Sequence, residues 1–70
     1  MAIHVAVTLV GGPHDGSVTS HTLHLIETRR GELLIENISY PLNARGERTG
    51  GYYFDGVGMA TWRAYEVPQP

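Results

Sequence analysis

The stretch LHLIETRRGELLI, residues 23–35, decides the fold class of this chain. Leu23 and Leu25 occupy alternate positions next to residues rich in β-branched side chains, and this period of two predicts a β-strand. Residues 28–31 have the composition of a type I turn, with Gly31 at the position where a G1 bulge requires positive φ. The stretch therefore predicts two antiparallel strands joined by a short turn.

The second arm of that hairpin is expected to run from Leu33 to Tyr40. The turn type fixes which residues lie opposite each other, since hairpin register follows from loop length and turn geometry. The bulge predicts that Leu25 pairs with Ile35 and that His24 pairs with Glu36.

The N-terminal part of the chain has the same period of two. Residues 3–9 carry apolar side chains at alternate positions, and the cluster GGPHDG, residues 11–16, predicts a turn. A strand is expected to follow from Val18 to Ile26. Pairing Val5 with Leu23 and Ile3 with Leu25 would place Ile3, Val5 and Val7 in the core and His4 opposite His24. A slip of one residue would turn every face over, so the register stays open at this point.

The C-terminal part predicts a loop and a second hairpin. Residues 41–51 are polar and aperiodic, residues 52–54 form a short aromatic strand, and Asp55-Gly56 is a two-residue hairpin signal. A fifth strand is expected from Val57 to Val67, ended by Pro68-Gln69-Pro70. No window has helical periodicity. The sequence thus predicts one all-β domain over residues 1–70, either a small five-stranded antiparallel barrel of SH3-like or OB-like type or a strongly bent sheet.

The size and composition of the chain favour self-association. Seventy residues bury only about 60% of their unfolded surface, and there is no cysteine to add a disulfide. In the predicted register Ile26, Leu34 and Ile38 share the face opposite the main core. Either a barrel covers them or a second copy does, and we expect a homo-oligomer.

Charge and hydropathy limit the possible partners. The net charge is −2, which argues against a general nucleic-acid binder. No segment approaches the ~20 apolar residues of a membrane span, and the N-terminus lacks the basic region of a signal peptide. The expected location is the cytoplasm, including the cytosol of a phage host, or the interior of a phage particle.

Three groups of residues are candidate binding sites. The predicted row His4, His24 and Glu36 could hold a zinc or iron ion, although three solvated polar side chains explain it equally simply. The glycine-rich turn offers Gly12, His14 and Asp15 as a recognition loop for an anion, or is only a tight turn. Arginine pairs at residues 29–30 and at Arg45 and Arg48 could clamp a phosphate or carboxylate, with Tyr53 stacking on the ligand, unless these groups are solvated charges and core aromatics.

Classical catalysis is poorly supported by the sequence. The three serines lie outside any G-x-S-x-G motif, and cysteine and lysine are absent. We therefore expect no enzymatic activity and no cofactor.

The segments VTLVGGPHDG (residues 7–16) and WRAYE (residues 62–66), with Tyr40 and an arginine-containing loop between them, carry a family resemblance. The chain resembles small uncharacterised proteins of actinobacteria and their phages that begin with a strand and a G-G-P-x-D-G turn. The resemblance implies a phage or prophage origin and assigns no activity. Three hypotheses follow: an oligomeric binding module that sequesters a phosphate-bearing nucleotide or binds a host protein, a structural or assembly component of a phage particle, or a His/Glu metal protein.

Overall fold

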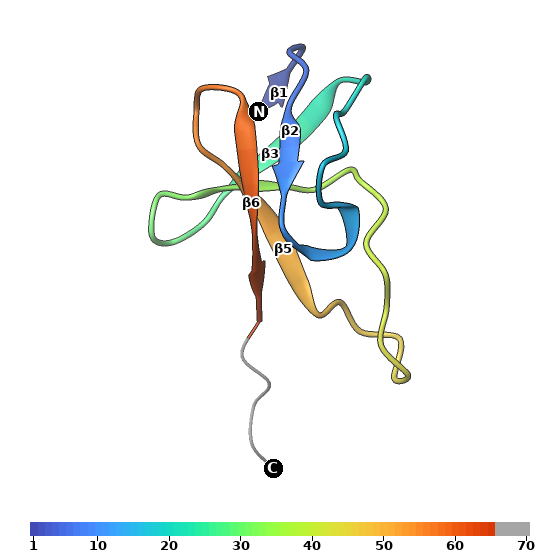
Figure 1. Cartoon of the computed structure of the whole chain (residues 1–70). Helices are drawn as coiled ribbons and strands as arrows, with labels where there is room; N and C mark the ends of the chain where they lie inside the picture. The colour runs from blue at the N-terminus through green and yellow to red at the C-terminus, as the bar shows by residue number, and fades with distance from the viewer. Residues whose placement is uncertain (66–70) are drawn as a thin grey trace.

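The computed structural model describes residues 1–65 and contains six short strands (Figure 1). They are β1 Ala2–Ile3, β2 Thr8–Val10, β3 Leu23–Glu27, β4 Leu33–Ile35, β5 Gly50–Phe54 and β6 Met59–Ala64, with a 3-10 turn, η1, over Gly12–His14. The described part of the chain contains no α-helix, so the predicted all-β class is confirmed.

The strands form one mixed sheet in the order β1-β3-β4-β5-β6-β2. All neighbours are antiparallel except β2 and β6, so the prediction of five purely antiparallel strands is wrong. The two edge strands belong to one stretch of chain, and a flat six-stranded sheet would hold them about 24 Å apart. Ile3 and Thr8 are five residues apart and can be separated by at most about 18 Å, so the sheet must curl. The sheet is nevertheless not closed into a barrel.

The hairpin over residues 23–35 has the predicted register. Leu25 pairs with Ile35, and the Glu36 N–H donates to the His24 carbonyl at 2.8 Å. Gly31 has φ of 77°, as the bulge requires. A local signal was sufficient here because the turn alone fixes the pairing.

The first hairpin is offset by two residues from the predicted pairing. Ile3, not Val5, pairs with Leu23. The reason lies in the turn: the Leu9 N–H donates to the Ser17 carbonyl at 2.8 Å, so the hairpin closes directly after η1. An offset of two keeps Leu23 and Leu25 on the core face, but it removes His4 from opposite His24.

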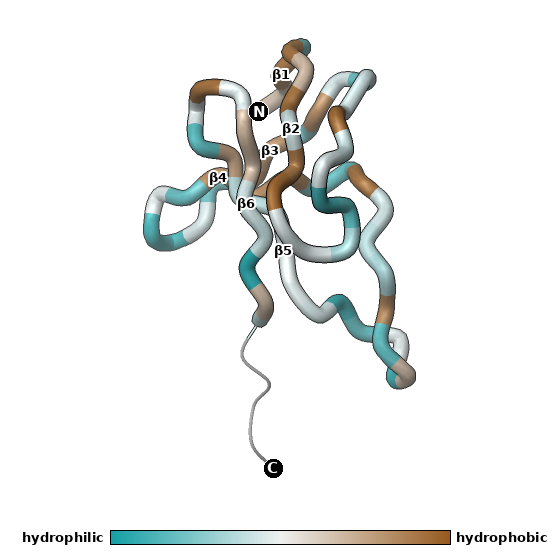
Figure 2. The backbone as a smooth tube through the Cα atoms, viewed as in Figure 1, coloured by the Kyte–Doolittle hydropathy of each residue, from teal (hydrophilic) through white to brown (hydrophobic). Residues whose placement is uncertain are grey.

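The core lies on the inner face of the curled sheet, where the apolar parts of β2 and β3 converge (Figure 2). Its buried members are Val7, Leu9, Leu23, Leu25, Ile35, Tyr52 and Ala60. Two predictions about burial are wrong. Val5 is 52% exposed because the strand is interrupted between β1 and β2. Ile38 packs against the core instead of sharing a face with Ile26 and Leu34, because β4 ends at Ile35 and the alternation stops there.

The β5–β6 turn is one residue longer than predicted. Phe54 pairs with Ala60 and the Asp55 N–H donates to the Met59 carbonyl at 2.9 Å, which leaves residues 56–58 as the loop. The Asp55 carboxylate accepts the N–H groups of the loop at 2.7–3.2 Å, and these bonds lower its pKa. The predicted end of the last strand, at Val67 and Pro68-Gln69-Pro70, lies outside the described residues.

Candidate functional site: an arginine–tyrosine groove

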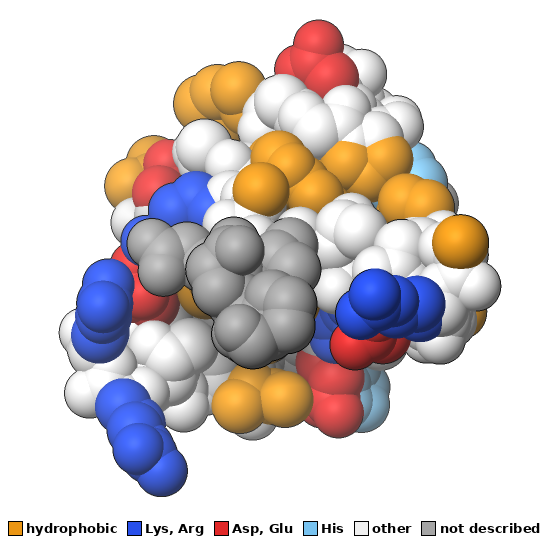
Figure 3. All heavy atoms as spheres, turned by 90° about the horizontal axis from the view of Figure 1, so that it is seen from below, with side chains coloured by type: hydrophobic (Ala, Val, Ile, Leu, Met, Phe, Trp, Pro, Cys, Tyr) orange, Lys and Arg blue, Asp and Glu red, His pale blue; other side chains and the backbone are white. Residues whose placement is uncertain are grey.

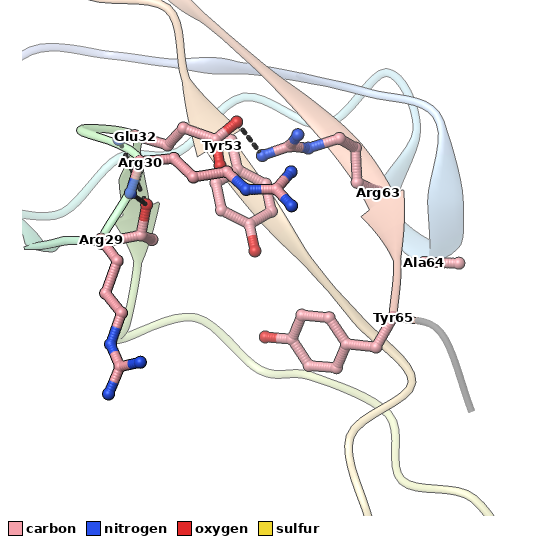
Figure 4. A pocket seen from close by; sticks show the side chains of 8 residues that line it. Arg29, Arg30, Glu32, Tyr53, Arg63, Ala64 and Tyr65 are labelled. Carbon is pink, nitrogen blue, oxygen red and sulfur yellow. Dashed lines mark hydrogen bonds and ion pairs between the residues drawn. The ribbon is translucent and has the colours of Figure 1, made fainter. Parts of the chain in front are cut away.

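A groove of about 500 Å³ lies where the β3–β4 hairpin faces β5 and β6 (Figure 4). We call it the arginine groove. The hairpin contributes Thr28, Arg29, Arg30 and Glu32, and the other wall contributes Tyr53, Arg63, Ala64 and Tyr65. Three guanidinium groups and one carboxylate therefore line it, in a chain whose net charge is −2.

One wall of the groove is a cation–π pair. The Arg63 Cζ lies 4.0 Å from the centroid of the Tyr53 ring, and the Arg63 guanidinium forms an ion pair with Glu32. The sheet register explains this contact, since Tyr53 pairs with Thr61 and Arg63 follows two residues later on the same face. The Arg63 side chain stays 46% exposed, so part of it remains accessible to a ligand.

The other wall of the groove is the β3–β4 turn, whose conformation is stabilised by the Thr28 hydroxyl. That hydroxyl accepts the N–H groups of Arg30 at 3.3 Å and Glu32 at 3.2 Å, which fixes the turn between them. The Arg30 side chain extends across the groove in front of Tyr53, whereas Arg29 points away from the other lining side chains (Figure 4). Arg30 and Arg63 therefore both reach into the groove from opposite walls, with Arg29 at the rim.

Tyr65 lies at the lower end of the groove in Figure 4, and its hydroxyl is hydrogen-bonded to Arg48. The Arg48 Nη2 donates to the Tyr65 hydroxyl at 3.3 Å, and the Arg48 Cζ lies 3.9 Å from the centroid of the Tyr40 ring. The Arg48 Nε is buried and has no hydrogen-bond partner within residues 1–65. Burial raises the pKa of Tyr40, whose hydroxyl donates to the Ile35 carbonyl at 2.7 Å. The predicted ligand contact Arg48 thus orients a groove residue and does not itself line the groove.

The glycine-rich turn lies elsewhere and uses its polar groups internally. The buried Tyr52 hydroxyl donates to the Gly11 carbonyl at 2.6 Å and accepts the His14 N–H at 2.8 Å. The Asp15 carboxylate accepts the Gly11 N–H at 2.7 Å, and the His14 imidazole contacts the Ser39 carbonyl. Of the groups predicted to recognise a ligand at this turn, His14 and Asp15 are already occupied by protein partners.

Gly12 and Arg45 also lie outside the arginine groove. A Cβ at Gly12 would overlap the indole of Trp62, so this glycine allows the turn to pack on β6. Arg45 sits in a turn closed by Asn43, whose side chain accepts the Arg45 N–H at 2.8 Å. Figure 3 shows arginine side chains at two separate places on one face of the molecule. Of the six predicted ligand contacts, Tyr53 alone lines the groove.

The predicted metal row is not assembled. The offset in the first hairpin places the His4 Nδ1 3.0 Å from the Thr22 hydroxyl, so His4 does not face His24. Within residues 1–65, no three His, Asp or Glu side chains are arranged to hold a metal ion.

Sequence reasoning noted the Arg29–Arg30 pair but missed Glu32, Arg63 and Tyr65 as partners of Tyr53. The cause is the β5–β6 turn, because a two-residue loop would have turned β6 over relative to β5. With the three-residue loop, Tyr53 pairs with Thr61 and shares its outer face with Arg63. The odd loop length of Gly56-Val57-Gly58, after the capping residue Asp55, was the signal that could have revealed this pairing.

Comparison with known proteins adds no assignment. No protein-family model, characterised protein or solved structure matches the chain. Among residues 1–65, no helix has the length and apolar character needed to cross a membrane.

Proposed function

We propose that this protein is a non-enzymatic binding module whose arginine groove takes a small phosphate-bearing ligand with a planar ring, such as a nucleotide. The observation that carries the proposal is the lining itself: three arginines, one carboxylate and two tyrosines around about 500 Å³. That volume lies in the range of small-molecule sites. Arginine guanidinium groups match phosphate geometry, and tyrosine and arginine faces stack on bases.

The chemistry of the groove favours binding over catalysis. Its one carboxylate, Glu32, is ion-paired with Arg63, and its other charged groups are guanidiniums, which do not lose protons near neutral pH. The groove also lies on an outer face of the sheet next to exposed Arg29 and Arg30. Such a site can hold an anion but has little means of excluding water around a reaction.

The proposal is tested by isothermal titration calorimetry with guanosine, adenosine and uridine monophosphates and with the matching nucleosides. We expect the monophosphates to bind and the nucleosides to bind more weakly. Arg30→Ala should weaken binding about 10- to 100-fold, because a charged hydrogen bond contributes about 1.5–3 kcal/mol. Its thermal unfolding should remain close to that of the parent protein.

Arg45→Ala is the matched control, because it removes an equally exposed arginine from the loop 43–47. We expect it to bind like the parent. If no monophosphate binds, or if Arg45→Ala and not Arg30→Ala weakens binding, the groove is not the site and the proposal is wrong.

The biological setting that we propose is that of a phage or prophage accessory protein in the host cytoplasm. The family resemblance and the lysine-free composition support it.

We propose further that the module is a homo-oligomer, since Ile26 is 44% exposed beside Leu34 on the outer face. Sedimentation equilibrium tests this point: a monomer at all concentrations would exclude it. Residence in a phage particle, with that face against another chain, remains the alternative, and mass spectrometry of purified particles decides it.

A further inference from the structure

The arginine groove contains one group that is unsuited to a phosphate. Glu32 is an acceptor-only carboxylate on the groove wall, and its side chain is 32% exposed. A carboxylate repels a phosphate, so the phosphate has to lie toward Arg30, away from Glu32. The part of the ligand that reaches Glu32 must instead offer hydrogen-bond donors.

Glu32 is well placed to read such donors. Its Oε2 accepts from Arg63, which holds the carboxylate in position, and its Oε1 has no hydrogen-bond partner within residues 1–65. A carboxylate has about four lone-pair sites, so one bond to Arg63 leaves capacity for two more. The Arg63 guanidinium stacks on Tyr53. Its accessible part gives a platform on which a base can lie with its edge near Glu32.

Among the common bases, guanine alone presents two adjacent donors, a ring N–H and an amino group, on one edge. Adenine and cytosine place an amino donor beside a ring acceptor, and uracil places its one N–H between two carbonyl oxygens that a carboxylate repels. We infer that the arginine groove selects guanine nucleotides, with Glu32 accepting from the base edge while Arg30 holds the phosphate. This inference rests on the proposed function and names its ligand class.

The test is calorimetric titration of the parent protein and Glu32→Gln with guanosine, inosine and uridine monophosphates. Inosine lacks the amino group and is otherwise the same ligand. A bidentate base contact discriminates by about 1–3 kcal/mol, so we expect the parent to prefer guanosine over uridine monophosphate by about 5- to 100-fold, with inosine between them. In Glu32→Gln that preference should fall below about 3-fold.

The uridine arm separates recognition from a merely structural role. Glu32→Gln removes a negative charge beside the phosphate site, so uridine monophosphate should bind as well as before or better. Equal weakening of all three nucleotides would mean that Glu32 only supports Arg63, and the inference would be wrong. Glu36→Gln, an exposed glutamate that does not line the groove, should behave like the parent.

The two proposals fail in different ways. Binding of all three nucleotides with equal affinity overturns the guanine inference and leaves the phosphate site standing. Absence of binding by every nucleotide overturns both.

Discussion

Two turns of this molecule suggested chemistry from their sequences, and the structure uses them in opposite ways. The turn at residues 11–16 is fastened to the core by the hydroxyl of the fully buried Tyr52. Within residues 1–65, the turn at residues 28–31 is held by its own backbone and by the Thr28 hydroxyl, and its two arginines project into or beside a groove. In the first turn the polar groups are satisfied by the protein, and in the second they remain available to a ligand.

The contrast teaches that turn composition does not distinguish a recognition loop from a structural one. A glycine-rich turn can aim N–H groups at an anion, but it can equally aim them at a tyrosine from another strand. Whether the polar groups of a turn are available to a ligand depends on which core residues the turn packs against. Behind residues 11–16 lie Tyr52 and Trp62, whereas a Cβ at Gly31 would meet nothing within 4 Å.

Substituting one glycine in each turn should give the largest difference in the free energy of unfolding between the two turns. Gly12 and Gly31 have φ of 66° and 77°, so an alanine at either position carries the left-handed penalty of about 1–2 kcal/mol. At Gly12 the new Cβ also overlaps Trp62, and forced overpacking adds about 1–3 kcal/mol. We expect Gly12→Ala to lower the free energy of unfolding by about 2–5 kcal/mol and Gly31→Ala by about 1–2 kcal/mol, measured by urea denaturation.

The difference between the two variants reports mainly on the contact with Trp62, because both glycines have positive φ angles of similar size. Equal losses would show that the indole moves aside freely, and the account of a turn packed on β6 would be wrong.

The sequence predicted most reliably what short segments determine alone. The pairing of Leu25 with Ile35 follows from a turn four residues long and was confirmed. The inward faces of Leu23 and Leu25 follow from alternation and survived the two-residue offset in the first hairpin. Local turn chemistry and periodicity therefore account for the all-β class and for much of the core.

What could not be predicted depends on contacts between distant segments. The parallel pairing of β2 with β6 joins residues about fifty positions apart and has no local signal. The Tyr53–Arg63 stack required the loop length at Asp55, and the hydrogen bonds of Tyr52 required knowing which turn lies above it. The candidate site was therefore only partly predictable, because its two walls come from hairpins that are far apart in sequence.

Removal of one hydroxyl should have the next largest effect. Tyr52→Phe keeps the buried ring but leaves the Gly11 carbonyl and the His14 N–H without their partner, which should cost about 1–3 kcal/mol. Urea denaturation measures the loss, and faster amide hydrogen exchange at His14 locates it. Tyr53→Phe is the matched control from the groove, where the hydroxyl bonds to no group within residues 1–65, and we expect a change within about 0.5 kcal/mol. A larger loss in the control than in Tyr52→Phe would reverse the contrast between the two turns.

The smallest effect concerns a third turn, which is held by a carboxylate instead of a tyrosine hydroxyl. The Asp55 carboxylate accepts the N–H groups of Gly58, Val57 and Met59, and these bonds lower its pKa. Because the folded-state pKa lies below the unfolded value of about 3.9, the stabilisation is complete above that pH and is lost as the pH falls through the folded-state pKa.

Asp55→Asn, which cannot ionise, should therefore be less stable than the parent at pH 6, and the difference should shrink steadily below about pH 4. Thermal unfolding of both proteins between pH 6 and pH 2 measures it. A difference that stays constant over this range would mean that the charge of Asp55 contributes nothing to the turn. The His14 amide gives an internal comparison, because its acceptor is the Tyr52 hydroxyl and not a carboxylate, so that amide should stay protected while the turn at residues 55–59 loosens.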